Sequence, residues 1–102
     1  MTRRQLAKVR SELEELRARL ASIRPAELVA LAKKMGRKLV NRGKEPTYEH
    51  PNEDWPPLTI PAHPGTLPKG TAHSILRALE ADLERLEEVA EDGDGVGEEA
   101  AN

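Results

Sequence analysis

The stretch LTIPAHPGTLPKGTAHSIL, residues 58–76, contains in succession the signals of a β-strand, a loop and a helix. Its first three residues, Leu-Thr-Ile, form a β-prone run, and Pro61 ends that run because proline cannot donate to a sheet ladder. Residues 62–70 are rich in proline and glycine, which are common turn-forming residues. The stretch therefore predicts a short strand followed by a tight loop.

A helix is predicted to follow this loop. Thr71 is the predicted N-cap, because its hydroxyl can accept a hydrogen bond from an amide of the first helical turn. The exposed amides of a helix start favour an anion, and the loop before them carries His63 and Lys69. Downstream the apolar residues recur at helical spacing; they are Ile75, Leu76, Leu79, Leu83 and Leu86.

Several short motifs, in this order and spacing, resemble those of HicA-type toxins of toxin–antitoxin systems. The family pattern has a strand, the motif (T/V)(I/V)P.H, a short Gly/Pro/Lys loop, Gly-Thr and then Ser-Ile-Leu. The matching residues here are Thr59, Ile60, Pro61, His63, Gly70, Thr71, Ser74, Ile75 and Leu76. Segments 27–29, 39–40, 42–44 and 48–51 match further upstream, so the resemblance covers about residues 25–79.

The upstream sequence predicts one helix and two more strands. Pro25 suits the first turn of a helix, and Gly36 suits the position just after its end. The predicted strands are 37–42, 47–50 and 58–61, and residues 51–57 form a polar connection. The order helix, strand, strand, strand, helix indicates an α+β fold. The resemblance implies the same architecture, which is similar to that of double-stranded RNA-binding domains.

Both ends of the chain extend beyond this domain. Residues 2–23 carry apolar residues at alternating spacings of three and four, which is typical of a coiled-coil arm or of an amphipathic helix packed on the domain. The last helix continues with the same spacing and is acidic. We expect the basic first arm and the acidic last helix to pack together, within one chain or in a homodimer. The predicted regions are an arm at 1–24, the domain at 25–79, a helix extension at 80–90 and a disordered acidic tail at 91–102.

Composition narrows the classes of function. The 102 residues include no cysteine and no apolar run long enough for a signal segment or a membrane span, which favours a cytoplasmic protein. The net charge of −2 divides into +4 over residues 1–24, +3 over 25–77 and −9 over 78–102. A basic body with an acidic end suits a protein that meets an anion, and it equally suits a set of solvated helix faces. Nucleotide-binding glycine motifs and a nucleophile elbow are absent from the sequence.

The resemblance implies an mRNA interferase whose histidine, in a Gly-Ser-His turn after the first strand, acts as base on a ribose 2′-hydroxyl. Here Glu45 occupies the histidine position. Because a carboxylate is a weak base toward a sugar hydroxyl, His63 is the first catalytic candidate and Glu45 the second. The histidines His50, His63 and His73 lack metal-ligand spacing, so no metal or cofactor is predicted.

RNA contact is predicted at the basic and aromatic residues of the domain. Double-stranded RNA is bound mainly through phosphates and 2′-hydroxyls, for which cations suffice, whereas single-stranded bases need aromatic rings. The predicted RNA-binding residues are Lys38, Arg42, Lys44, Tyr48 and Lys69. The resemblance implies a toxin that cleaves mRNA and is neutralised by a HicB-like antitoxin. The alternative is a catalytically inactive module that binds RNA or protein and assembles through its helical arms.

Overall fold

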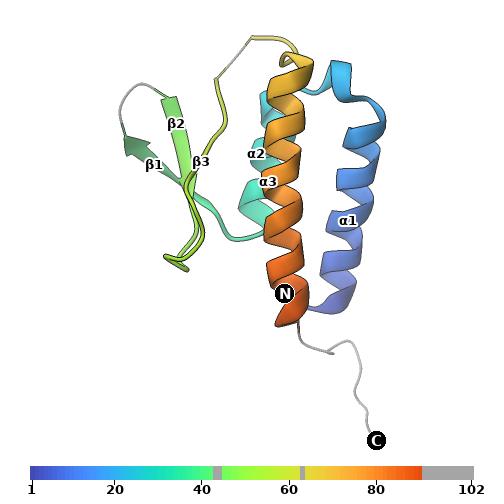
Figure 1. Cartoon of the computed structure of the whole chain (residues 1–102), viewed down its shortest axis with the longest axis vertical. Coiled ribbons are helices and arrows are strands. Elements are labelled where there is room, and N and C mark those ends of the chain that lie inside the picture. The colour runs from blue at the N-terminus through green and yellow to red at the C-terminus, as the bar shows by residue number, and fades with distance from the viewer. Residues whose placement is uncertain (43–44, 63, 91–102) are drawn as a thin grey trace, which may run out of the picture.

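The computed structural model describes residues 1–42, 45–62 and 64–90. Three long helices lie side by side, and a small sheet covers the flank of α3 (Lys69–Glu88) that faces away from α1 (Arg3–Ala18) (Figure 1). α3 is the central element, because it contacts α1, the short 3-10 helix η1 (Leu20–Ser22), α2 (Pro25–Lys34) and β3 (Leu58–Thr59). The predicted α+β fold and its order of elements are confirmed.

The first two helices begin and end where their capping residues require. The Thr2 hydroxyl accepts from the Gln5 amide and the Gln5 side chain accepts from the Thr2 amide, which forms a capping box for α1. Pro25 occupies the first turn of α2, as predicted. Gly36 follows this helix with φ +102°, a left-handed conformation that L side chains rarely adopt.

α3 begins earlier than the sequence predicts. Its N-cap is Pro68, whose carbonyl accepts from the Ala72 amide at 2.9 Å. The Leu67 amide donates to the Ile23 carbonyl at 2.8 Å, which fixes the chain at the end of η1 just before the helix starts. Thr71 therefore lies inside the first turn, and its prediction as the N-cap is wrong. A proline before the helix supplies an extended residue without needing an amide partner of its own.

The sheet is antiparallel with the order β1 (Lys38–Arg42), β2 (Glu45–Glu49) and β3. Leu39, Tyr48 and Leu58 lie opposite one another in this register and so share one face. Tyr48 and Leu58 belong to the core, whereas Leu39, on the outer strand, is 49% exposed. The sheet therefore packs on the helices mainly through β2 and β3.

One hydrophobic core joins α1 to the predicted domain. The buried residues of α1, namely Leu6, Val9, Leu13 and Leu16, belong to the same cluster as Leu28 of α2 and Leu76, Leu79 and Leu83 of α3. Arg10 pairs with Glu87 at 2.7 Å, and Arg17 pairs with Glu80. These pairs require α1 and α3 to run antiparallel, so the predicted packing of the two arms is confirmed within one chain.

Two further expectations concern the ends of the chain and its relation to membranes. α3 ends at Glu88, so the predicted extension at 80–90 is helical over most of its length. The predicted acidic tail, 91–102, lies outside the described residues. Among the residues described, none of the helices has both the length and the apolar character needed to cross a membrane.

Candidate functional site

Glu45 lies at the end of the sheet where the chain leaves β3. Arg42 and Glu45 face each other where β1 ends and β2 begins. The Ile60 amide donates to the Pro46 carbonyl at 3.2 Å, which holds the chain leaving β3 beside the start of β2. The connection from β3 then crosses toward the start of α3 at the same end of the molecule (Figure 1). The topology thus brings Glu45 close to the segment that leads to position 63.

The catalytic candidates differ in how far their surroundings are described. His63 and Lys44 lie outside the described residues. Glu45 is exposed at the first position of β2, so its carboxylate keeps its contact with water. A solvated carboxylate is a weak base for a ribose hydroxyl. The environment of Glu45 therefore gives no support for a role as general base.

The predicted cations do not form one cluster. Arg42 ends β1 opposite Glu45, whereas Lys38 begins the same strand and lies opposite Glu49. Four residue spacings along the extended strand separate these two positions by about 13 Å. Lys69 is exposed at the first position of α3. The end of the sheet that contains Glu45 therefore also contains position 42, and Lys38 lies at the other end.

Tyr48 does not present a ring for base stacking. It is 6% exposed, and it belongs to the hydrophobic core beneath the sheet. Its predicted role as an RNA-binding residue is corrected, because packing against the helices already covers the ring. Trp55, the other aromatic residue of the domain, is also buried. The centroid of its ring lies 3.7 Å from that of His50, with 17° between the ring planes.

His50 has a structural role. Its Nδ1 accepts from the Asn52 amide at 3.0 Å, and its ring stacks on Trp55. Burial is the main cause that lowers the pKa of His50, which favours the neutral ring. A Cβ at Gly36 would lie 2.9 Å from His50 Nε2, so this ring needs glycine beside it. Since the Asn52 amide and the Trp55 ring engage this imidazole, His50 is not available as a catalytic base.

A buried ion pair that sequence reasoning missed lies at the opposite end of the sheet. The Arg37 guanidinium donates to both carboxylate oxygens of Asp82, at 2.7 and 3.0 Å. It also donates to the carbonyls of Tyr48 at 2.9 Å and Pro56 at 3.0 Å. The two side chains are 1% and 0% exposed. One guanidinium therefore joins α3 to β2 and to the connection after it.

Arg37 is thus buried through its ion pair with Asp82. The sequence does contain a signal for it, because Asp82 lies three residues after Leu79 and four before Leu86, within the apolar stripe of α3. A carboxylate on a buried stripe requires a buried cation. No group of three or more His, Asp or Glu side chains that could hold a metal ion occurs in the described parts of the chain.

Comparison with known proteins identifies the family of this domain. A family model described as the HicA toxin of bacterial toxin–antitoxin systems matches residues 25–81, which is more than half of the 102 residues. No curated protein and no solved structure matches the chain. The matched region agrees with the resemblance at 25–79, includes α2, the whole sheet and most of α3, and leaves out α1. The chain therefore belongs to the HicA toxin family of bacterial toxin–antitoxin systems.

Proposed function

We propose that this chain is a toxin that binds RNA, cleaves mRNA slowly and is neutralised by a HicB-like antitoxin. The observation that carries the proposal is the family match over residues 25–81. The meeting of the β1–β2 hairpin and the β3–α3 connection at one end of the sheet supports a site there. Cytoplasmic location belongs to the same proposal, because mRNA is the proposed substrate.

The proposed cleavage uses the 2′-hydroxyl of the RNA itself. A base removes the proton of this hydroxyl, the 2′-oxygen attacks the adjacent phosphorus, and the bond from phosphorus to the 5′-oxygen of the next nucleotide breaks. His63 is the proposed base, since a neutral imidazole accepts a proton near neutral pH. The cations Arg42, Lys44 and Lys69 are proposed to bind the phosphate, where charge develops during the attack.

The replacement of the family's histidine by Glu45 favours a second candidate function. In this alternative the chain is catalytically inactive and acts as an RNA-binding or protein-interaction module. The observation in its favour is that the residue at the position of the family's histidine, Glu45, lies exposed to solvent at the start of β2. A homodimer would need a surface other than the leucine stripes of α1 and α3, because these stripes are buried within one chain.

The proposed RNA contacts predict a strong dependence of affinity on salt. Neutralising several phosphates releases counterions, so the affinity for a structured RNA should fall by one or more orders of magnitude between about 50 and 200 mM salt. A fluorescence-anisotropy titration at the two salt concentrations measures the change. Absence of binding at the lower concentration would reject RNA as a partner.

The choice of base predicts different effects for two substitutions. His63→Ala should remove RNA cleavage, with a loss of about 10²-fold or more, because general bases contribute rate factors of this size. Glu45→Ala should change the cleavage rate by less than about threefold. Cleavage of a labelled RNA and growth arrest after induced expression provide the two readouts. If Glu45→Ala alone abolished both, Glu45 would be the catalytic group; if the parent showed neither, the inactive module would be favoured.

A further inference from the structure

A groove runs between α1 and α3, and its charge changes sign along its length. The α3 wall carries Lys69, His73 and Arg77 at intervals of four residues, so the three side chains share one face of the helix. The same face continues with Glu80 and Glu84. Lys69 and Arg77 therefore make the groove basic near the start of α3, and the two carboxylates make it acidic farther along.

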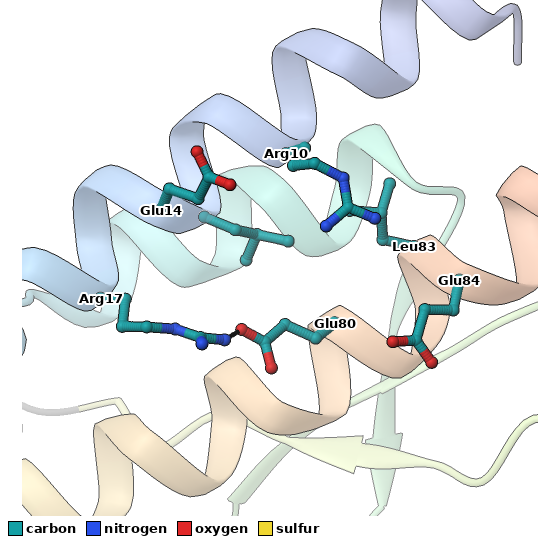
Figure 2. A pocket seen from close by; sticks show the side chains of 7 residues that line it. Arg10, Glu14, Arg17, Glu80, Leu83 and Glu84 are labelled. Carbon is teal, nitrogen blue, oxygen red and sulfur yellow. Dashed lines mark ion pairs between the residues drawn. The ribbon is translucent and has the colours of Figure 1, made fainter.

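Arg17 supplies the α1 wall of the basic half. One hollow of about 540 Å³ is lined by Arg17, His73 and Arg77 together with Glu80 and Glu84. A second hollow of about 490 Å³ is lined by Arg17, Arg19 and Lys69 and has no carboxylate among its lining residues. Arg17 thus faces both hollows. Its side chain is 57% exposed although it pairs with Glu80, so more than half of the side chain remains accessible to a ligand. Figure 2 shows Arg17 extended toward Glu80 across the groove.

We propose that Arg17 of α1, together with Lys69, His73 and Arg77 of α3, extends the RNA-phosphate surface of the toxin. The proposal rests on RNA binding as the proposed function. α1 lies outside the region that the family model matches, so this part of the surface belongs to the added helix. The RNA backbone would run from the loop before α3 along the basic half of the groove.

The position of this surface connects it with the proposed catalytic loop. Lys69 begins α3 directly after the connection from β3, and the Leu67 amide bonds to Ile23 beside η1. Lys69 and Arg77 are separated by about 12 Å along the helix axis, which is long enough to contact successive phosphates of one strand. The phosphate-binding surface ends at Glu80 and Glu84, because carboxylates repel phosphate. RNA is favoured over an acidic protein segment because the stripe leads directly from the segment that carries His63.

Arg10 provides a matched control for Arg17. It lies on the same helix and bridges to Glu87 of α3 at 2.7 Å, in the same kind of exposed ion pair. It lines the groove among Glu14 and Glu84, in the acidic half (Figure 2). Exposed pairs of this kind contribute little to stability, so Arg17→Gln and Arg10→Gln should both fold and melt at similar temperatures.

The test measures the affinity of the full chain for a labelled RNA hairpin of about 20 base pairs, a length that exceeds the span of a double-stranded RNA-binding domain. Arg17→Gln should weaken binding roughly three- to tenfold and reduce the salt slope by about one, as expected for a lost phosphate contact. Arg10→Gln should change the affinity by less than about twofold, because its charge is distant and screened. Glu80→Gln should strengthen binding, since it removes a carboxylate and releases Arg17.

The proposal is tested by the direction in which each substitution changes the RNA affinity. A purely structural Arg17–Glu80 pair predicts that Arg17→Gln and Glu80→Gln act alike, and a shared direction of change in RNA affinity would overturn the proposal. Equal affinities for the parent, Arg17→Gln and Arg10→Gln would overturn it while leaving RNA binding intact. Poly-glutamate serves as a second probe that represents an acidic protein segment. If Arg17→Gln lost poly-glutamate binding while its RNA binding was unchanged, the surface would be assigned to an acidic protein partner. If the parent binds no RNA, this proposal fails together with RNA binding itself.

Discussion

Asp82→Ala is expected to lower the free energy of unfolding by about 3–5 kcal/mol, because it leaves the Arg37 guanidinium buried without its partner. Arg37 is 1% exposed and its carboxylate partner is 0% exposed, so water cannot replace the lost contact without a structural change. Small domains have a total stability of about 5–15 kcal/mol. Urea unfolding followed by circular dichroism measures the loss. The single tryptophan, Trp55, lies beside Arg37 and provides a fluorescence signal from the same region.

Arg85 supplies the control for this prediction. Its guanidinium contacts the same Asp82 oxygen that accepts from Arg37, at 3.2 Å, but its side chain is 40% exposed. Arg85→Ala should therefore cost less than about 1 kcal/mol, as exposed ion pairs usually do. Equal losses for Asp82→Ala and Arg85→Ala would show that burial of the Arg37–Asp82 pair does not determine its contribution.

The Arg37–Asp82 pair also shows where sequence reasoning stops. Arg37 follows a helix that ends in Lys33 and Lys34, and in the sequence it belongs to the same run of cations. Lys34 does remain exposed and pairs with Glu12 of α1 at 2.9 Å. Only the packing of β1 and α3 distinguishes the buried cation from the exposed ones, since the two partners are separated by forty-five positions in the chain.

Helix ends could be predicted where they depend on residues that are adjacent in the sequence. Pro25 and Gly36 gave the bounds of α2 within two residues, because each acts on the backbone at its own position. The second strand was predicted to begin at residue 47, whereas in the structure Pro46 already lies within β2, where its carbonyl accepts from the Ile60 amide. A proline can occupy this position because the pairing uses its carbonyl and requires no amide. Whether a proline can join a strand therefore depends on the neighbouring strand, and the sequence around the proline does not show it.

The candidate site could be predicted in part. The motif around His63 and the position of Glu45 follow from the order of short motifs, and the family match over residues 25–81 confirms the family. The role assigned to Tyr48 was wrong, because alternation along a short strand does not tell which face meets the helices. The groove at Arg17 could not be predicted, since it depends on the antiparallel packing of α1 on α3.

Deleting residues 1–22 is expected to abolish cooperative unfolding of the monomer or to cause aggregation. The deletion removes four buried side chains of α1, namely Leu6, Val9, Leu13 and Leu16, and it uncovers the α3 residues that they contact. Burial of each such side chain contributes about 1.5–3 kcal/mol, an upper estimate when the unfolded chain is compact. Their sum approaches the whole stability of a small domain. Thermal melts and light scattering of the truncated chain measure the outcome.

A pair of alanine substitutions separates the contribution of burial from that of helix formation. Leu13→Ala, at a buried position of α1, should lower the free energy of unfolding by about 2–5 kcal/mol. Ser11→Ala, at an exposed position of the same helix, should change it by less than about 0.5 kcal/mol. Both substitutions introduce a good helix former, so a difference between them reports packing against the core.

A truncated chain that remained monomeric with the parent's melting temperature would show that α1 adds no stability to the family domain. In that case its leucine stripe would serve a partner outside this chain.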